Sequence, residues 1–203
     1  VVSVVLSSSP QAATTSLSAT GSALRRSFSH PSEAHRPDTG IGCTPDPNNV
    51  IANPGFESGT TNWSFYTNGQ GSFTTSSPAY QCEWTSQITL SRVGSNMQLL
   101  QTGFLLNENG RYRLSFAATS SSGQDLRVYI HRHSSPYTSY GLDGELFDLT
   151  QDWQTFSTEF TSSGFSGTTA DTRLRFWFTG LTSNGDVYWI DDVMLEEVDN
   201  PAA

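Results

Sequence analysis

The strongest constraint on the fold is a series of short stretches after Pro47 in which apolar and polar residues alternate. They read SQITLSRV, NMQLLQTGFLL, RYRLSFAAT, DLRVYIHRH, GELFDLT, QTFSTEFT, TRLRFWFTG and DVYWIDDVMLEEV. Turn-forming clusters such as NENG and SNGD separate them. A period of two places successive side chains on opposite faces of a strand, and no helical period appears. The pattern predicts an all-β fold, a two-sheet antiparallel β-sandwich of the jelly-roll type.

The segment before the first strand differs in composition. VVSVVL is followed by a Ser/Thr/Ala-rich, low-complexity stretch that reaches residue 47. One interpretation is a signal-peptide remnant followed by a linker. The alternative is an arm that adds a strand to a neighbouring subunit through residues 1–20. We expect the sandwich domain over residues 48–198 and a short tail over residues 199–203.

The charge balance excludes several classes of partner. Charged residues make up only 14% of the chain, the net charge is −9, and all ten basic residues are arginine. Without a basic stripe, nucleic acid is not an expected partner. No apolar run approaches the roughly 20 residues that cross a bilayer, so no membrane span is expected. Abundant Ser, Thr, Gly and aromatic residues are typical of a secreted β-protein.

Two cysteines, Cys43 and Cys82, are too few for a disulfide scaffold or for a zinc site of their own. In an oxidising compartment they are expected to pair with each other, which would tie the end of the linker to a loop of the domain. Two unrelated thiols are the alternative.

Two stretches share an unusual distribution of side chains between their faces. One face is apolar and carries Leu126, Val128 and Ile130 in the first stretch, and Leu174, Phe176 and Phe178 in the second. The opposite face carries Arg127, Tyr129, His131 and His133, and Arg173, Arg175, Trp177 and Thr179. A purely solvated face more often carries Thr, Lys and Glu, so these strands indicate a functional face. The alternative is a polar layer satisfied beneath a loop.

Several segments, in order, carry a family resemblance. They are NPGFESG followed by a tryptophan, YRLSFAA, DLTQDWQTFSTEF, RLRFWFTG and VYWIDDVMLEEV. The chain resembles extracellular carbohydrate-binding modules of the β-jelly-roll type found in families four, nine and twenty-two, over about residues 48–198. The resemblance implies polysaccharide binding, and a structural Ca²⁺ held where the first and last strands lie near each other. We expect N-P-G-F-E to be part of the first of these strands and I-D-D-V part of the last.

The resemblance also implies which residues hold the calcium ion. Glu57 and Asp191 would supply carboxylate oxygens, the ligands that Ca²⁺ prefers, with backbone carbonyls completing the shell. Strict alternation places Asp191 and Val193 on one face and Asp192 on the other. Only one of the two aspartates can then face the ion, and Asp192 is the second choice. The alternative is that Glu57 caps a turn and that the aspartates lie at a solvated strand end.

A sugar site needs flat rings to stack on the C–H face of a pyranose and polar groups to bind its hydroxyls. On the functional face we expect these to be Trp177, Tyr129, Arg175 and His131. From Gly/Ser/Pro-rich loops we expect Trp84, Tyr137 and Tyr140 at the rim, with Tyr80 nearby. Trp63 and Trp153 are expected in the core instead.

Catalytic patterns are weak. Glu83, Asp143 and Glu145 fall in expected loops, but nothing pairs them as a glycosidase requires. His131 and His133 have the spacing of metal ligands without a visible third ligand. We therefore expect a non-catalytic module that binds polysaccharide of the β-glucan or xylan type and accompanies a glycoside hydrolase. The alternative is a subunit of an extracellular filament or surface layer that assembles through its N-terminal strand.

Overall fold

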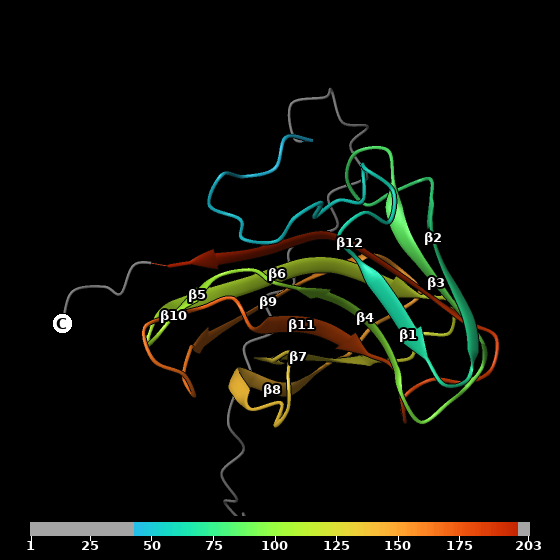
Figure 1. The fold of residues 1–203 in the computed structure, drawn as a ribbon. Helices are drawn as coiled ribbons and strands as arrows, with labels where there is room; N and C mark the ends of the chain where they lie inside the picture. Colours follow the sequence, from blue (N-terminus) through green and yellow to red (C-terminus); the bar gives the residue numbers. More distant parts are fainter. Residues whose placement is uncertain (1–42, 199–203) are drawn as a thin grey trace, which may run out of the picture. The chain divides into compact units, whose positions relative to one another are not determined.

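The computed structural model describes residues 43–198, which form a β-sandwich (Figure 1). One antiparallel sheet has the strand order β1-β4-β11-β7-β8, and the other has the order β2-β3-β12-β6-β9. A two-stranded pair, β5 and β10, is separate from both sheets. No helix occurs in this part of the chain, and correspondingly no segment of it is a helix able to cross a membrane. The expected all-β sandwich is confirmed.

The strand boundaries follow the alternating stretches of the sequence. The first sheet contains β1 (Ser64–Thr67), β4 (Met97–Thr102), β11 (Thr172–Trp177), β7 (Leu126–Arg132) and β8 (Ser139–Phe147). The second contains β2 (Gln70–Ser76), β3 (Thr85–Arg92), β12 (Asp186–Glu197), β6 (Arg111–Ser120) and β9 (Gln154–Thr161). The short pair is β5 (Leu106–Asn107) and β10 (Thr168–Thr169).

The core lies between the two sheets and is rich in aromatic rings. The expected apolar faces of β7 and of the β11 stretch are confirmed, because all six of their residues are fully buried. The Phe116 ring packs edge-to-face on Phe176 at 5.1 Å and on Phe147 at 5.0 Å. Trp63 is buried beside Phe56 and Phe176, as expected for a core tryptophan. Since both sheets contribute, this cluster fixes how they stack.

The N-P-G-F-E segment lies beside the last strand, as expected, but it is not a strand. Val193 N donates to the carbonyl of Pro54 at 3.1 Å, and Val50 N donates to the carbonyl of Leu195 at 2.9 Å. Asn53 and Phe56 have positive φ angles, which breaks the chain into turns. These turns bury the Phe56 side chain completely and leave Glu57 exposed.

Strand β12 contains a bulge that overturns the expected alternation of its residues. Its register against β6 shifts between Asp191 and Met194, and Asp192 has a φ of 49°. After one extra residue, Val193 and Leu195 face the core on the same side as Ile190, although Val193 was expected beside Asp191. Asp191 is fully buried and Asp192 is exposed.

Two expectations about the ends of the chain concern residues outside the described range. Residues 1–42 of the expected remnant, linker or arm, including the strand-donating residues 1–20, are among them, and so are residues 199–203. The division into a tail, a domain over residues 48–198 and a C-terminal tail stays a prediction.

Candidate functional site

The outward side of the β1-β4-β11-β7-β8 sheet, called here the open face, brings polar and aromatic side chains into cross-strand rows. The pairing register defines these rows. The first row is Tyr66, Gln98, Trp177, Arg127 and Leu146. The second is Ser64, Leu100, Arg175, Tyr129 and Asp143. The third is Thr102, Arg173, His131 and Ser139. Cross-strand neighbours on one face are close enough to contact a ligand together.

Arg175 lies between two rings of the open face. Its guanidinium carbon is 4.2 Å from the centroid of the Tyr129 ring and 4.8 Å from that of the Trp177 ring. Both distances are within the range of a cation–π contact. The guanidinium therefore fixes the two rings that were expected to stack on a sugar, and both belong to neighbouring strands of the same sheet.

His131 points to the open face, as expected, but it is almost entirely covered there, with 4% of its surface exposed. Its Nδ1 lies 2.6 Å from the carbonyl oxygen of Arg132, and since a carbonyl can only accept, Nδ1 carries the proton. Burial, together with the nearby charges of Arg175 and Arg173, lowers the pKa of His131 to about 4. The ring is neutral at physiological pH, with Nε2 as a hydrogen-bond acceptor.

Buried polar atoms without partners gather on this face. In the described part of the chain, four buried side-chain atoms have no hydrogen-bond partner, and three of them belong to the open face: Gln98 Oε1, His131 Nε2 and Arg175 Nε. Leaving such an atom unpaired is costly, so groups of this kind in native proteins call for an explanation. Two of these atoms accept and one donates. A hydroxyl group of a ligand can satisfy either kind.

A loop between β7 and β8 forms one border of the open face. Tyr137 is 58% exposed there, with a positive φ angle, so its ring is available to a ligand as expected. The Arg173 guanidinium lies 5.9 Å from the Tyr137 ring centroid and donates to His133 Nδ1 through Nη2 at 2.8 Å. His133 is thus an acceptor for arginine, which is incompatible with its nitrogen Nδ1 binding a metal at the same time.

The expectations for Tyr140, Trp153 and Trp84 need correction. Tyr140 is not at the rim: it is 2% exposed and packs edge-to-face on Phe165, because β8 begins at Ser139 and turns Tyr140 inward with Leu142. Trp153 is only half-buried and packs on Tyr80 at 5.6 Å, outside the core cluster.

Trp84 is exposed, but it immediately precedes β3 in the other sheet, and Tyr80 lies in the same β2–β3 loop. The structure does not bring them together with Trp177.

The open face also contains residues that were not singled out as site residues: Tyr66, Gln98, Leu100, Arg127, Arg173 and Asp143. Alternation within their strands had already placed Arg127 and Arg173 on the outward side. The others depend on which strands pair, which a single sequence does not show. The WSFYT stretch of β1 carries the same alternation signal as the longer strands and would have identified Tyr66.

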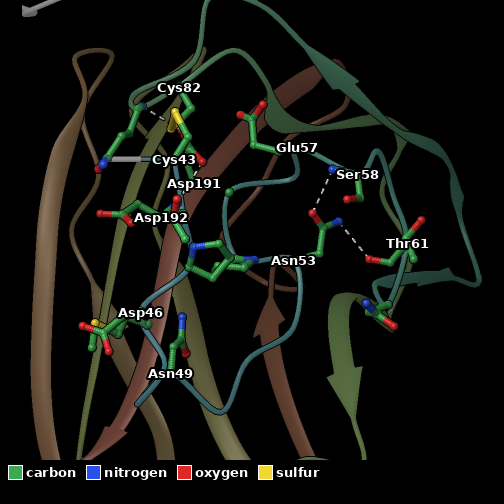
Figure 2. Close-up of a pocket in the computed structure, with 17 residues that line it drawn as sticks. Cys43, Asp46, Asn49, Asn53, Glu57, Ser58, Thr61, Cys82, Asp191 and Asp192 are labelled. Atoms are coloured by element: carbon green, nitrogen blue, oxygen red, sulfur yellow. Dashed lines mark hydrogen bonds between the residues drawn. A yellow bond between two sulfur atoms is a disulfide. The ribbon is translucent and has the colours of Figure 1, made fainter. Parts of the chain in front are cut away.

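A second concave site, called here the acidic pocket, lies beside the β12 bulge (Figure 2). It has a volume of about 470 Å³. Its polar lining consists of acidic, amide and hydroxyl side chains, and includes Asp46, Asn49, Glu57, Asp191 and Asp192. Glu57 and Asp191 thus face the same pocket, as the resemblance implied. The turn passes close to both side chains, because a Cβ placed on Gly55 would be in ordinary contact with Asp191 Oδ1 at 3.6 Å and with Glu57 Cγ at 4.0 Å.

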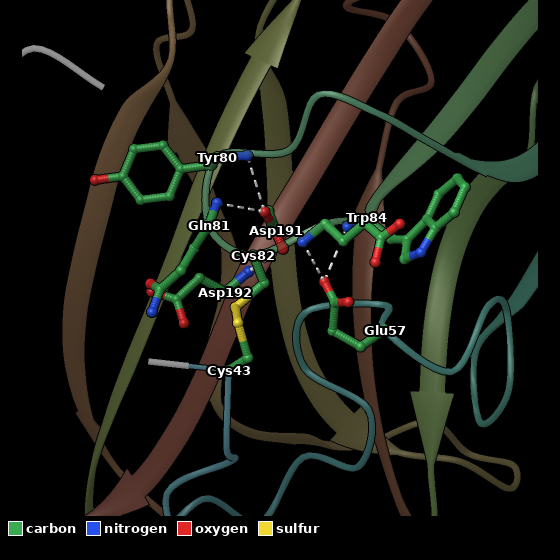
Figure 3. The surroundings of a disulfide bond; sticks show 9 residues. Cys43, Glu57, Tyr80, Gln81, Cys82, Trp84, Asp191 and Asp192 are labelled. Carbon is green, nitrogen blue, oxygen red and sulfur yellow. Dashed lines mark hydrogen bonds between the residues drawn. A yellow bond between two sulfur atoms is a disulfide. The ribbon is translucent and has the colours of Figure 1, made fainter. Parts of the chain in front are cut away.

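Both carboxylates also hold the β2–β3 loop in place (Figure 3). Asp191 Oδ2 accepts hydrogen bonds from Tyr80 N and Gln81 N, each at 3.0 Å. Glu57 Oε1 accepts from Glu83 N at 3.0 Å and Trp84 N at 2.9 Å. The expected disulfide is present in the same loop: Cys82 is bonded to Cys43, with Cα atoms 5.6 Å apart.

The acidic pocket offers hard oxygen ligands and no cationic side chain. Burial raises the pKa of Asp191 to about 7, and the ion pairs of the described residues involve Arg111, Arg113 and Arg132, which are elsewhere. No group of three or more His, Cys, Asp or Glu in residues 43–198 forms a metal site. Carboxylates alone would therefore not complete a calcium shell, and amide or carbonyl oxygens would have to contribute, as Ca²⁺ allows.

Comparison with known proteins decides the family. The family model described as "Carbohydrate binding domain" matches residues 48–184, well over half of the chain. The chain belongs to this family. No curated protein matches it by sequence.

Solved structures similar to this carbohydrate-binding domain share its fold at low identity. One, titled "CBM4 structure and function", has a TM-score of 0.58 and 18% identity, and the match covers 70% of this chain and 99% of that one. The N-terminal cellulose-binding domain of Cellulomonas fimi β-1,4-glucanase C has a TM-score of 0.53 and 19% identity, covering 68% and 90%. The CBM22-1 xylan-binding domain of Paenibacillus barcinonensis Xyn10C has a TM-score of 0.51 and 19% identity, and the match covers 72% of this chain and 92% of that one.

Proposed function

We propose that this carbohydrate-binding domain binds a polysaccharide chain across the open face, without catalysis, outside the cell and as an accessory to a glycoside hydrolase. The observation that carries the proposal is the set of three partnerless buried polar atoms beside two ordered rings. The family and the disulfide fit an extracellular protein. Chains of the β-glucan or xylan type are the proposed ligands, by analogy with similar domains titled as cellulose-binding and xylan-binding.

The chemistry of the face matches that of a sugar ring. Trp177 and Tyr129 supply ring surface for the C–H face of a pyranose, on the sides that Arg175 does not cover. Once the side chains that cover them move aside, His131 Nε2 and Gln98 Oε1 accept from sugar hydroxyls and Arg175 Nε donates to a hydroxyl oxygen. Because Arg175 already holds the Tyr129 and Trp177 rings, these rings lose little side-chain freedom when the ligand binds.

Replacing Trp177 with alanine tests the stacking. We expect Trp177→Ala to weaken binding by about 1–3 kcal/mol, the range for a buried aromatic anchor of an interface. Affinity electrophoresis in gels containing β-glucan or xylan, followed by calorimetry on the gel that retards the wild type, measures the loss. The fold is retained because this side chain lies outside the core cluster.

Trp84→Ala is the matched control, since Trp84 is an exposed tryptophan that precedes a strand of the other sheet. It should migrate like the wild type on every gel. Equal retardation of Trp177→Ala and the wild type would show that the ligand does not lie on this part of the open face. No retardation of the wild type by any polysaccharide would contradict the proposed function itself.

We also propose that the acidic pocket holds a structural calcium ion, with Glu57 and Asp191 as its carboxylate ligands. The ion would neutralise the buried Asp191 and join the N-P-G-F-E turn, the β2–β3 loop and β12, which all reach this pocket. The fully buried carboxyl group of Asp191 supports the proposal, because backbone N–H groups bind it but the pocket has no cationic side chain to balance its charge.

Chelation provides the test of calcium binding. We expect EDTA to lower the melting temperature and excess Ca²⁺ to restore it, since a ligand at 100 times its Kd stabilises by about 2.7 kcal/mol. Glu57→Gln should abolish this response, whereas the control Glu196→Gln, at a carboxylate outside the pocket that pairs with Arg113, should keep it. Identical melting of the wild type in EDTA and in Ca²⁺ would rule the site out.

A further inference from the structure

The open face concentrates positive charge in an acidic protein. The chain has a net charge of −9, yet Arg127, Arg173 and Arg175 occupy successive outward positions on β7 and β11. None of the three has a carboxylate within ion-pair distance. The ion pairs of residues 43–198 involve Arg111, Arg113 and Arg132 instead. Arg127 Nη1 donates only to a neutral group, the Gly144 carbonyl, at 2.7 Å.

This arrangement is unfavourable without a ligand. Burial lowers the pKa of both Arg173 and Arg175, and Arg173 lowers that of Arg175 further. The carboxylate of Asp143, next to Tyr129 in the register, attracts Arg175 but is not within ion-pair distance of it. The rings of Tyr129 and Trp177 compensate part of the charge, and Arg175 Nε is left without a partner.

Neutral sugar hydroxyls do not require this charge. Asn, Gln and neutral His bind hydroxyls without the desolvation cost of a guanidinium, and the open face already has Gln98 and neutral His131 for that role. A planar guanidinium is instead suited to an oxyanion, which it binds through two parallel N–H groups.

We infer that the open face selects anionic polysaccharides, chains whose sugar rings carry carboxylate or sulfate groups, with Arg173 and Arg175 binding the oxyanion and His131 and Gln98 the neighbouring hydroxyls. This inference rests on the proposed function and specifies its substrate class. A xylan bearing uronic acids fits both the proposed function and this inference, because its backbone is neutral and its side groups are charged. Selective binding cannot arise from the net charge of the protein, since that charge repels a polyanion.

The experiment compares pairs of polymers that differ only in charge. The pairs are uronate-bearing xylan against the same xylan with its carboxylates reduced to alcohols, and polygalacturonate against its methyl ester, in affinity gels and by calorimetry. We expect the acidic member of a pair to bind about ten-fold more tightly than its neutral counterpart, and this difference to shrink as sodium chloride screens the charges. A sulfated galactan in a further gel shows whether sulfate replaces carboxylate as the oxyanion.

Two variants and one control locate the charge effect. Arg173→Gln should reduce the preference for the acidic polymer by about ten-fold and retain binding to the neutral one. Arg175→Gln should weaken binding to both, because Arg175 also holds the two rings, and should weaken binding to the acidic polymer by about ten-fold more. Arg113→Gln should change neither, because Arg113 pairs with Glu159 and Glu196 on the other sheet. Melting curves of each variant verify that it is folded.

The outcomes separate the inference from the proposed function. Equal binding of charged and neutral members of each pair would overturn the inference and leave the proposed function intact. Failure to bind any polymer would overturn both. Equally strong retardation by a single-stranded oligonucleotide would also overturn the inference, because the face would then recognise charge without the sugar.

Discussion

Phe176→Ala should lower the free energy of unfolding by about 3–5 kcal/mol, the cost of a cavity where a fully buried aromatic ring has been removed. Phe176 has no exposed surface, and its ring contacts Phe116 of the other sheet at 5.1 Å and Trp63 at 6.2 Å between centroids. The variant therefore loses contacts that hold the two sheets together. Urea denaturation measures the effect as a lower midpoint with an unchanged slope.

The adjacent residue supplies the matched control. Trp177→Ala removes a larger ring from the opposite side of the same strand, and should change the free energy of unfolding by no more than about 1 kcal/mol, as for substitutions outside the core. Phe176→Leu, which keeps most of the buried volume, should cost less than Phe176→Ala. A larger loss for Trp177→Ala than for Phe176→Ala would mean that the faces of β11 have been assigned the wrong way round.

The disulfide should contribute about 2–4 kcal/mol to the free energy of unfolding, mainly by restricting the unfolded chain. It joins residues 39 positions apart. We expect the double variant Cys43→Ser, Cys82→Ser to unfold at a lower urea concentration by that amount. The loop that contains Cys82 keeps its hydrogen bonds to Asp191 and Glu57, so the folded state itself should persist.

Reduction provides an independent comparison with the same expected loss. Dithiothreitol should shift the unfolding midpoint of the wild type to that of the double variant and leave the variant unaffected. A wild-type curve that does not respond to reductant, combined with two titratable thiols in the unreduced protein, would contradict the bond between Cys43 and Cys82.

Most of the fold could be predicted from the sequence because alternation is a local property. The faces of β7 and β11 follow from residues two positions apart, and both were predicted correctly. The bulge at Asp192 could not be predicted in this way, since one inserted residue reverses every later side chain and has no compositional signature. The N-P-G-F-E turn was mistaken for a strand although Asn53, Pro54 and Gly55 are turn-forming residues.

The candidate site was less predictable because it depends on long-range pairing. Tyr129, His131, Arg175 and Trp177 were placed on the open face by alternation, and the structure brings them together. Trp84 was assigned there from loop composition alone, but its loop is positioned by Asp191, more than a hundred residues away in the sequence. Whether the four residues on the open face bind sugar, and whether Glu57 and Asp191 bind calcium, stay predictions.

The position of the disulfide has a mechanical consequence for this domain. When the two ends of the chain are pulled apart, tension that enters before Cys43 passes through the sulfur–sulfur bond directly to Cys82. The residues between them form a covalently closed loop outside this path, and they include the N-P-G-F-E turn, β1 and β2. Those elements can therefore be unravelled by stretching only after a covalent bond has been broken, whereas β3 and the strands that follow it bear the load.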